Sequence, residues 1–79
     1  IHPNPASTWV TIDYDLLVEP TDAAISIRDM TGREVKRIVL WDQLQQVLWD
    51  SREVAPGTYT VMLQNKHHHL RTEKLIIRQ

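Results

Sequence analysis

The 79-residue chain has no cysteine and only two glycines. Without cysteine it forms no disulfide and offers neither a thiol nucleophile nor thiolate ligands for zinc. It also lacks an excess of charge of one sign, because nine Lys and Arg face ten Asp and Glu, and this balance excludes an overall polycation of the kind that coats nucleic acid. No apolar run approaches the roughly 20 residues that a membrane-spanning helix needs. The composition is that of a globular domain.

Phenylalanine is absent as well, so the bulky core side chains must come from tryptophan and tyrosine together with Leu and Ile. The aromatic residues are Trp9, Tyr14, Trp41, Trp49 and Tyr59. Val, Ile and Thr number seven each, and such β-branched residues favour strands because their side chains suit a pleated surface. We therefore expect an all-β domain that relies on a dense core, since a small domain buries a limited share of its surface.

Two stretches in the first half of the chain, residues 9–14 and 23–30, alternate between apolar and polar residues as half-buried strands do. The side chains expected to point into the core are Val10, Ile12, Tyr14, Ile25 and Ile27. Ser26 and Arg28 are expected to point outward. A loop that contains proline separates the two predicted strands.

The segment Asp29-Met30-Thr31-Gly32-Arg33 is the sharpest local signal. Gly32 supplies the positive φ that a type I turn followed by a bulge requires, and the Asp29 carboxylate can accept hydrogen bonds from amides of the turn. Residues 33–40 are predicted to return as a strand. Together these features predict a hairpin.

The stretch after this hairpin fits two periodicities. In residues 41–48, Trp41, Leu44 and Leu48 fall at helical spacing, whereas the neighbouring strands favour a strand over residues 45–50. The sequence alone leaves helix and strand open here.

Ala55-Pro56-Gly57-Thr58 fits a type II turn, with proline second and glycine third. Residues 58–64 then alternate as a strand, and a second reversal starts at Asn65-Lys66. Leu70 lies out of phase with the apolar residues after it, so we expect a bulge or break near residues 71–73. Six or seven short strands separated by turns indicate an antiparallel β-sandwich.

Four landmarks occur in one order along the chain. They are Pro3-Asn4-Pro5-Ala6, Asp29-x-x-Gly32-Arg33-x-Val35, Ala55-Pro56-Gly57-x-Tyr59-x-Val61 and Lys74-Leu75-Ile76-Ile77-Arg78. In this order and at these distances they resemble the C-terminal sorting domain of proteins exported by the type IX secretion system, over essentially the whole chain. The chain departs from that pattern at Arg28, where the family often has Tyr, and at Asn65-Lys66, where a glycine is common.

The resemblance implies that residues 1–79 form one immunoglobulin-like antiparallel β-sandwich at the end of a longer carrier protein. In that family the domain is a folded address label. The carrier passes through the periplasm, and the label directs it through an outer-membrane translocon to the cell surface or out of the cell. A surface sortase often removes the label and joins the carrier to anionic lipopolysaccharide. The expected partners are therefore this translocon and sortase.

An address label shared by many carriers needs a recognised surface, and we expect it in the last strand. An edge strand offers amides and carbonyls to a receptor, and it also allows an edge-paired dimer. The expected translocon-recognition residues are Lys74, Leu75, Ile76, Ile77, Arg78 and Gln79. The alternative is that Leu75 and Ile77 are core residues whose loss merely unfolds the domain.

Charge is concentrated in the last hairpin, because residues 66–79 hold four basic residues against one acidic residue, a net charge of +3. The four basic residues are Lys66, Arg71, Lys74 and Arg78. They are candidates for contacting an anionic partner such as lipopolysaccharide or an acidic receptor face. The alternative is a solvated edge strand that its charges protect from aggregation.

Other chemistry has weaker support. His67-His68-His69 offers at most two zinc ligands on one strand face, so we expect a solvated turn, with no metal and no cofactor. Asp13 and Asp15 share a strand face without a partner acid, and no serine has a nucleophile-elbow context, so we expect no enzyme. Trp41 is the tryptophan expected to be exposed.

Two rivals to the sorting signal follow from these features. One is a retained module that docks its carrier to an outer-membrane protein or to surface lipopolysaccharide. The other is a carbohydrate-binding module, because tryptophan rings can stack on sugar faces.

Overall fold

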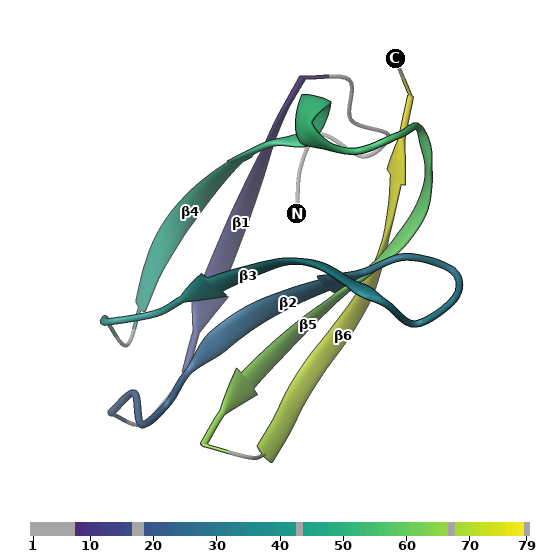
Figure 1. Ribbon diagram of the computed structural model, residues 1–79. Coiled ribbons are helices and arrows are strands. Elements are labelled where there is room, and N and C mark those ends of the chain that lie inside the picture. Colours follow the sequence, from purple (N-terminus) through teal and green to yellow (C-terminus); the bar gives the residue numbers. More distant parts are fainter. Residues whose placement is uncertain (1–7, 17–18, 43, 67, 79) are drawn as a thin grey trace.

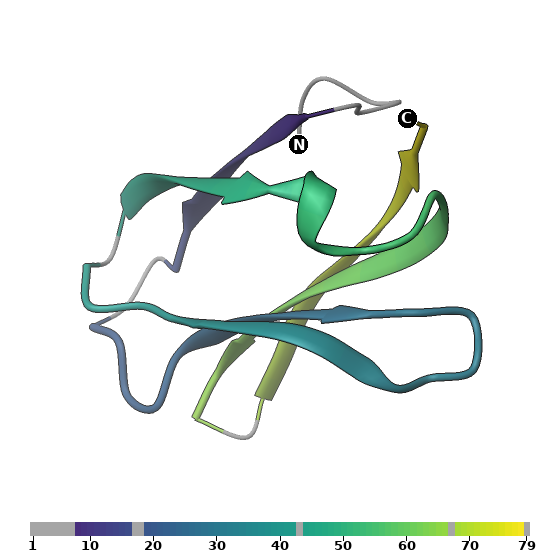
Figure 2. The same cartoon turned by 45° about the horizontal axis from the view of Figure 1, so that its top comes forward.

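The computed structural model describes residues 8–16, 19–42, 44–66 and 68–78, which form six β-strands and one short 3-10 helix. The elements are β1 (Trp9–Asp15), β2 (Ala24–Arg28), β3 (Glu34–Val39), β4 (Leu44–Asp50), η1 (Ser51–Glu53), β5 (Gly57–Asn65) and β6 (His68–Ile77). β1 pairs with β4, and the other four strands form a sheet in the order β3-β2-β5-β6, with every pairing antiparallel. The two sheets lie as separate layers (Figures 1 and 2), which confirms the predicted antiparallel β-sandwich.

The core lies between the two layers and takes side chains from both. Its buried members are Val10, Ile12, Tyr14, Leu16, Ala23, Ile25, Ile27, Leu40, Trp49, Tyr59, Val61, Leu75 and Ile77. The inward faces predicted for the first two strands are confirmed, because all five of their named residues belong to this cluster. The alternation was readable because each of these strands has one face on the core and one face away from it.

The outward face of β2 differs from a typical solvated face. Ser26 alternates with the core residues Ile25 and Ile27, yet its exposed fraction is 0%. β2 is an inner strand of the sheet, flanked by β3 and β5, and the Arg28 Nε donates a hydrogen bond of 3.3 Å to the Ser26 Oγ. Longer neighbouring side chains therefore cover a small residue that points away from the core.

The hairpin between β2 and β3 is confirmed. Gly32 has a φ of 89°, its amide donates to the Asp29 carbonyl at 3.0 Å, and a register shift after Ile27 marks the adjoining bulge. The Asp29 carboxylate accepts hydrogen bonds from the amides of Thr31 at 2.9 Å and Arg33 at 3.1 Å. This side chain replaces the hydrogen bonds that the strand ladder no longer provides at the turn.

The ambiguous stretch is a strand, since β4 covers Leu44–Asp50. Trp49 is 2% exposed and lies opposite Val10 in the register, so its indole fills the core. Its Nε1 donates to Glu53 Oε2 at 3.4 Å, and Lys36 Nζ lies 3.9 Å from the same oxygen. Glu53 thus links η1 and the two-stranded sheet to β3 of the other sheet.

The prediction of a type II turn over residues 55–58 was wrong. Such a turn needs a φ near +80° at its third position, whereas Gly57 has a φ of 158° and is already the first residue of β5. The Tyr59 hydroxyl donates a hydrogen bond to the Ala55 carbonyl, and Tyr59 itself is buried. A tyrosine that bonds back to the backbone a few residues upstream is a known corner device of β-sandwiches. This contact sets the path on which the chain enters the second sheet.

The last hairpin joins β5 to β6 and contains a bulge. Lys66 turns the chain with a φ of 54°. Leu63 pairs with Arg71 and Gln64 with His69, so Leu70 is the extra residue on β6. The bulge expected near residues 71–73 exists and lies directly before that range.

Candidate functional site

The last strand lies at one side of the four-stranded sheet, where β6 pairs with β5. Leu75 and Ile77 of this strand are 0% and 1% exposed, and both belong to the core cluster. Their side chains therefore anchor β6 to the sandwich. A receptor that meets the folded domain would reach the backbone of this segment and its outward side chains.

The outward residues of the same segment are Lys74 and Ile76, followed by Arg78 after the strand ends. The side chains of Lys74 and Arg78 are exposed, and Ile76 is half-buried opposite Thr58. Gln79 lies outside the described residues. The predicted recognition segment thus divides into a buried anchor and a basic outward face.

The four basic residues of the last hairpin are all exposed but do not form one patch. Lys66 lies in the β5–β6 turn, at the other end of β6 from Arg78. Arg71 pairs in register with Leu63, whose neighbours on that face are core residues, whereas Lys74 pairs with Thr60 on the outer face. Arg71 is also engaged, with its guanidinium 2.9 Å from Glu73. Arg71 and Lys74 are three residues apart on one strand without a bulge between them, so alternation places them on opposite faces.

Arg71 instead lies beside a cleft between the edges of the two sheets. The cleft is lined by Tyr14 and Asp15 of β1, Leu63 of β5 and Leu70 of β6, and has a volume of about 440 Å³. Burial raises the pKa of the Tyr14 hydroxyl, and the negative charge of Asp42 adds to that rise. Arg71 is part of the lining, but Asp13 and Asp15 place two carboxylates beside it, which makes this cleft a poor match for an anionic partner.

The sequence landmarks prove to be turn and corner positions where the structure describes them. Asp29 and Gly32 form the β2–β3 turn, and Pro56, Gly57 and Tyr59 form the corner into β5. The hydrogen bond from the Thr31 hydroxyl, together with those from two amides and the nearby Arg33 charge, lowers the pKa of the Asp29 carboxyl.

The first landmark, Pro3, Asn4 and Pro5, lies outside the described residues. The described landmarks are therefore framework positions, which hold the hairpin and the corner in place.

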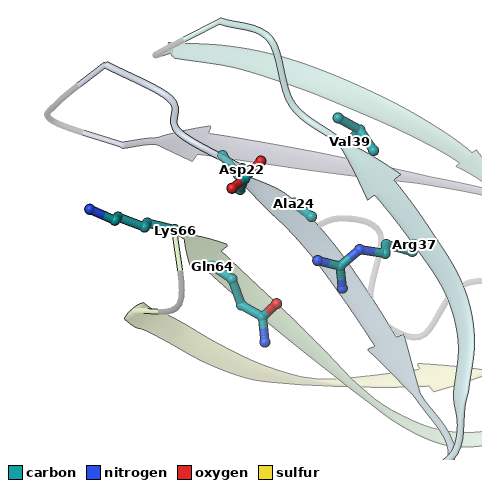
Figure 3. Close-up of a pocket in the computed structure, with 7 residues that line it drawn as sticks. Asp22, Ala24, Arg37, Val39, Gln64 and Lys66 are labelled. Atoms are coloured by element: carbon teal, nitrogen blue, oxygen red, sulfur yellow. The ribbon is translucent and has the colours of Figure 1, made fainter.

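Sequence reasoning missed a groove on the outer face of the four-stranded sheet, with a volume of about 420 Å³. Ala24 of β2 lies in line with Val39 of β3 and Gln64 of β5, so a small residue is flanked by two longer ones. Figure 3 shows the Arg37 side chain reaching over β2 toward Gln64, while Lys66 points away from the groove. Its lining comes from β2, β3 and β5 and from Asp22, Ala23 and Lys66 beside these strands. These segments are distant in sequence, so no local motif predicts the groove.

The other candidate chemistries gain little from the geometry. His68 and His69 are exposed, whereas His67 lies outside the described residues, so the prediction of a solvated turn is not tested there. Among the residues that the structure places, no three metal-ligating side chains form a group. Asp13 and Asp15 are exposed on the outer face of β1, where Gln46 Nε2 donates to Asp13 at 2.8 Å. The described ranges contain no helix with the length and apolar character to cross a membrane.

The tryptophans divide between the core and the surface. Trp49 is buried, whereas Trp41 is 82% exposed as predicted and Trp9 is 50% exposed. Trp9 starts β1, and Trp41 follows β3 of the other sheet. They lie on different elements, which gives no support to a shared platform for a sugar.

The family model of the secretion system C-terminal sorting domain matches residues 1–78. No curated protein and no solved structure matches the chain.

Proposed function

The chain belongs to the family of secretion system C-terminal sorting domains, and from that premise we propose that it is read as an address label through its last residues. As a member of the type IX family it is a sorting signal for export across the outer membrane. The observation that carries the proposal is the family match over 78 of the 79 residues. The activity of the carrier protein plays no part in this role.

The recognised segment in this proposal comprises residues 74–79. Leu75 and Ile77 hold the segment on the sandwich through core contacts, and Lys74 and Arg78 present positive charge to the translocon. A rigid anchor keeps the recognised groups in one geometry whatever carrier precedes the domain, which lowers the ordering cost of binding. The label has no catalytic part in this role.

The export test uses an inert periplasmic reporter fused to residues 1–79 in a host with a working type IX system. We expect the wild-type fusion to reach the medium or cell surface, and Lys74→Ala with Arg78→Ala to retain most of it in the periplasm. Arg52→Ala with Arg71→Ala is the matched control, since it removes two exposed positive charges that lie outside the terminal segment. Equal export of both double variants would overturn the role of the terminal segment, and a retained wild-type fusion would overturn the sorting role.

We further propose that a surface sortase separates the label from its carrier and joins the carrier to anionic lipopolysaccharide. Support for this step is the family membership alone. Mass spectrometry of the mature exported carrier tests it. Absence of peptides from residues 1–79, together with a lipopolysaccharide adduct at the new carrier end, is the expected result. Peptides from this domain in the mature protein would instead identify a retained docking module.

A further inference from the structure

The two outer faces of the sandwich carry opposite charge. On the four-stranded sheet, the strand register and the alternation of β2 place Arg28, Arg37 and Lys74 on the outer face, with Glu34 as their acidic neighbour. On the two-stranded sheet, the outward positions of β1 and β4 carry Asp13, Asp15 and Asp50. The basic cluster is not visible in the sequence, because its residues come from three different strands.

Each outer face also holds an ion pair within it. Arg52 of η1 forms two hydrogen bonds of 2.9 Å to the Asp50 carboxylate, which lowers the pKa of that carboxyl. On the basic face Glu34 lies 3.5 Å from Arg37, and both side chains remain well exposed, so water weakens this pair. The groove itself also has a carboxylate, Asp22, and a further cation, Lys66, in its lining. Four basic side chains (Arg28, Arg37, Lys66 and Lys74) thus stand against two acidic ones (Asp22 and Glu34) among the described residues of that face.

The basic face also has the shape of a docking surface. Ala24 and Ser26 of the inner strand β2 are nearly or fully buried, and the longer side chains of β3 and β5 rise on both sides of them. Arg37 lines the resulting groove and lies in register with Ser26. Figure 3 shows its guanidinium directed across the groove, where an incoming carboxylate would meet it. A guanidinium at the wall of a groove favours planar, two-point contacts with such a carboxylate.

We propose that this outer face of the four-stranded sheet, centred on Arg37 and the groove beside it, docks on an acidic protein surface of the secretion machinery. The inference rests on the proposed function, because a sorting domain acts through that machinery. Charge complementarity selects an acidic occupant. The acidic layer on the opposite side of the domain opposes binding in the inverted orientation, because its carboxylates would face the carboxylates of the partner and repel them. Lys74 lies on the same face, so the docking surface is continuous with the terminal segment.

The experiment compares Arg37→Glu with Arg71→Glu in the reporter fusion. The two arginines form a matched pair, because both belong to the four-stranded sheet and each pairs with one glutamate. Their side chains are 49% and 71% exposed, so neither substitution disturbs the core. Each substitution changes the net charge by the same amount, on different faces of the sheet. Melting temperatures close to that of the wild type confirm that both variants fold.

We expect Arg37→Glu to lower the exported fraction by about fivefold or more, and Arg71→Glu to keep it within about twofold of the wild type. Arg37→Lys keeps the charge but loses the two-point contact, so we expect its exported fraction to lie between those of the wild type and Arg37→Glu. Normal export of Arg37→Glu beside an exported wild type would overturn the docking surface and leave the sorting role intact. An equal loss in Arg71→Glu would overturn it too, because the effect would then follow net charge. Retention of the wild type would refute both.

An anionic polysaccharide is the competing occupant of this face, and a separate binding experiment tests it. Purified wild-type domain and Arg37→Glu are mixed with vesicles that contain smooth lipopolysaccharide, and sedimentation measures the bound fraction. We expect the wild-type domain to stay in the supernatant. Vesicle binding that Arg37→Glu abolishes, together with unchanged export of that variant, would assign the face to polysaccharide and overturn the protein partner.

Discussion

Leu75→Ala tests whether the terminal strand is held by core contacts. The Leu75 side chain is 0% exposed and lies in register with the buried Tyr59. Truncating a fully buried leucine costs about 2–5 kcal/mol, because a residual cavity adds to the lost transfer free energy. In a domain of this size each 1 kcal/mol lowers the melting temperature by roughly 4–8 °C, so we expect a fall of about 10 °C or more in thermal denaturation followed by circular dichroism.

Ile76→Ala is the matched control, since Ile76 is the next residue and is half-buried away from the core. Its expected cost is about 1 kcal/mol. A reporter fusion that carries Leu75→Ala should be exported like the wild-type fusion, provided that export is measured at a temperature where this variant is still folded. A melting temperature for Leu75→Ala within about 3 °C of the wild type would refute the assignment of Leu75 to the core. Blocked export of the folded variant would show that Leu75 also serves recognition.

Two further predictions concern the corner and the first hairpin. Tyr59→Phe removes the hydroxyl that donates to the Ala55 carbonyl, so thermal denaturation should show a loss of about 1 kcal/mol; an unchanged melting temperature would mean that the corner does not depend on this bond. The lowered pKa of Asp29 means that its stabilising contribution is complete above the ordinary carboxyl value of 3.8 and disappears as the pH falls through the lower folded value. The melting temperature of Asp29→Asn should therefore lie below that of the wild type at pH 7, and the gap should narrow as the pH falls below 3.8. A gap independent of pH would contradict this account.

The elements that the sequence predicted well are those with short-range causes. Val10, Ile12 and Tyr14 alternate because β1 has one face on the core, and the period of two is visible within a few residues. The β2–β3 turn was predicted equally well, because Gly32 and the Asp29 carboxylate, which together form it, lie within five residues of each other. For residues 45–50 the neighbouring strands favoured a strand, but the helical spacing of Trp41, Leu44 and Leu48 left a helix open until the structure placed β4 there.

What the sequence could not supply depends on contacts between distant segments. The corner before β5 differs from a type II turn because the Tyr59 hydroxyl fixes Ala55 while Gly57 already pairs with Ile77. The grouping of basic residues depends on strand order, which places Arg37 of β3 on the same face as Lys74 of β6. The terminal segment was located correctly at one side of the sheet, while its role in recognition stays a prediction.

The extra residue at Leu70 uncouples the two halves of β6. Beyond it, Leu75 and Ile77 keep their phase with β5, whereas the residues before it follow the tip of the hairpin. A homologue that gains or loses a residue at this tip can therefore absorb the change locally and leave the packed half of the strand in register. We expect length variation among related chains to concentrate between β5 and this position.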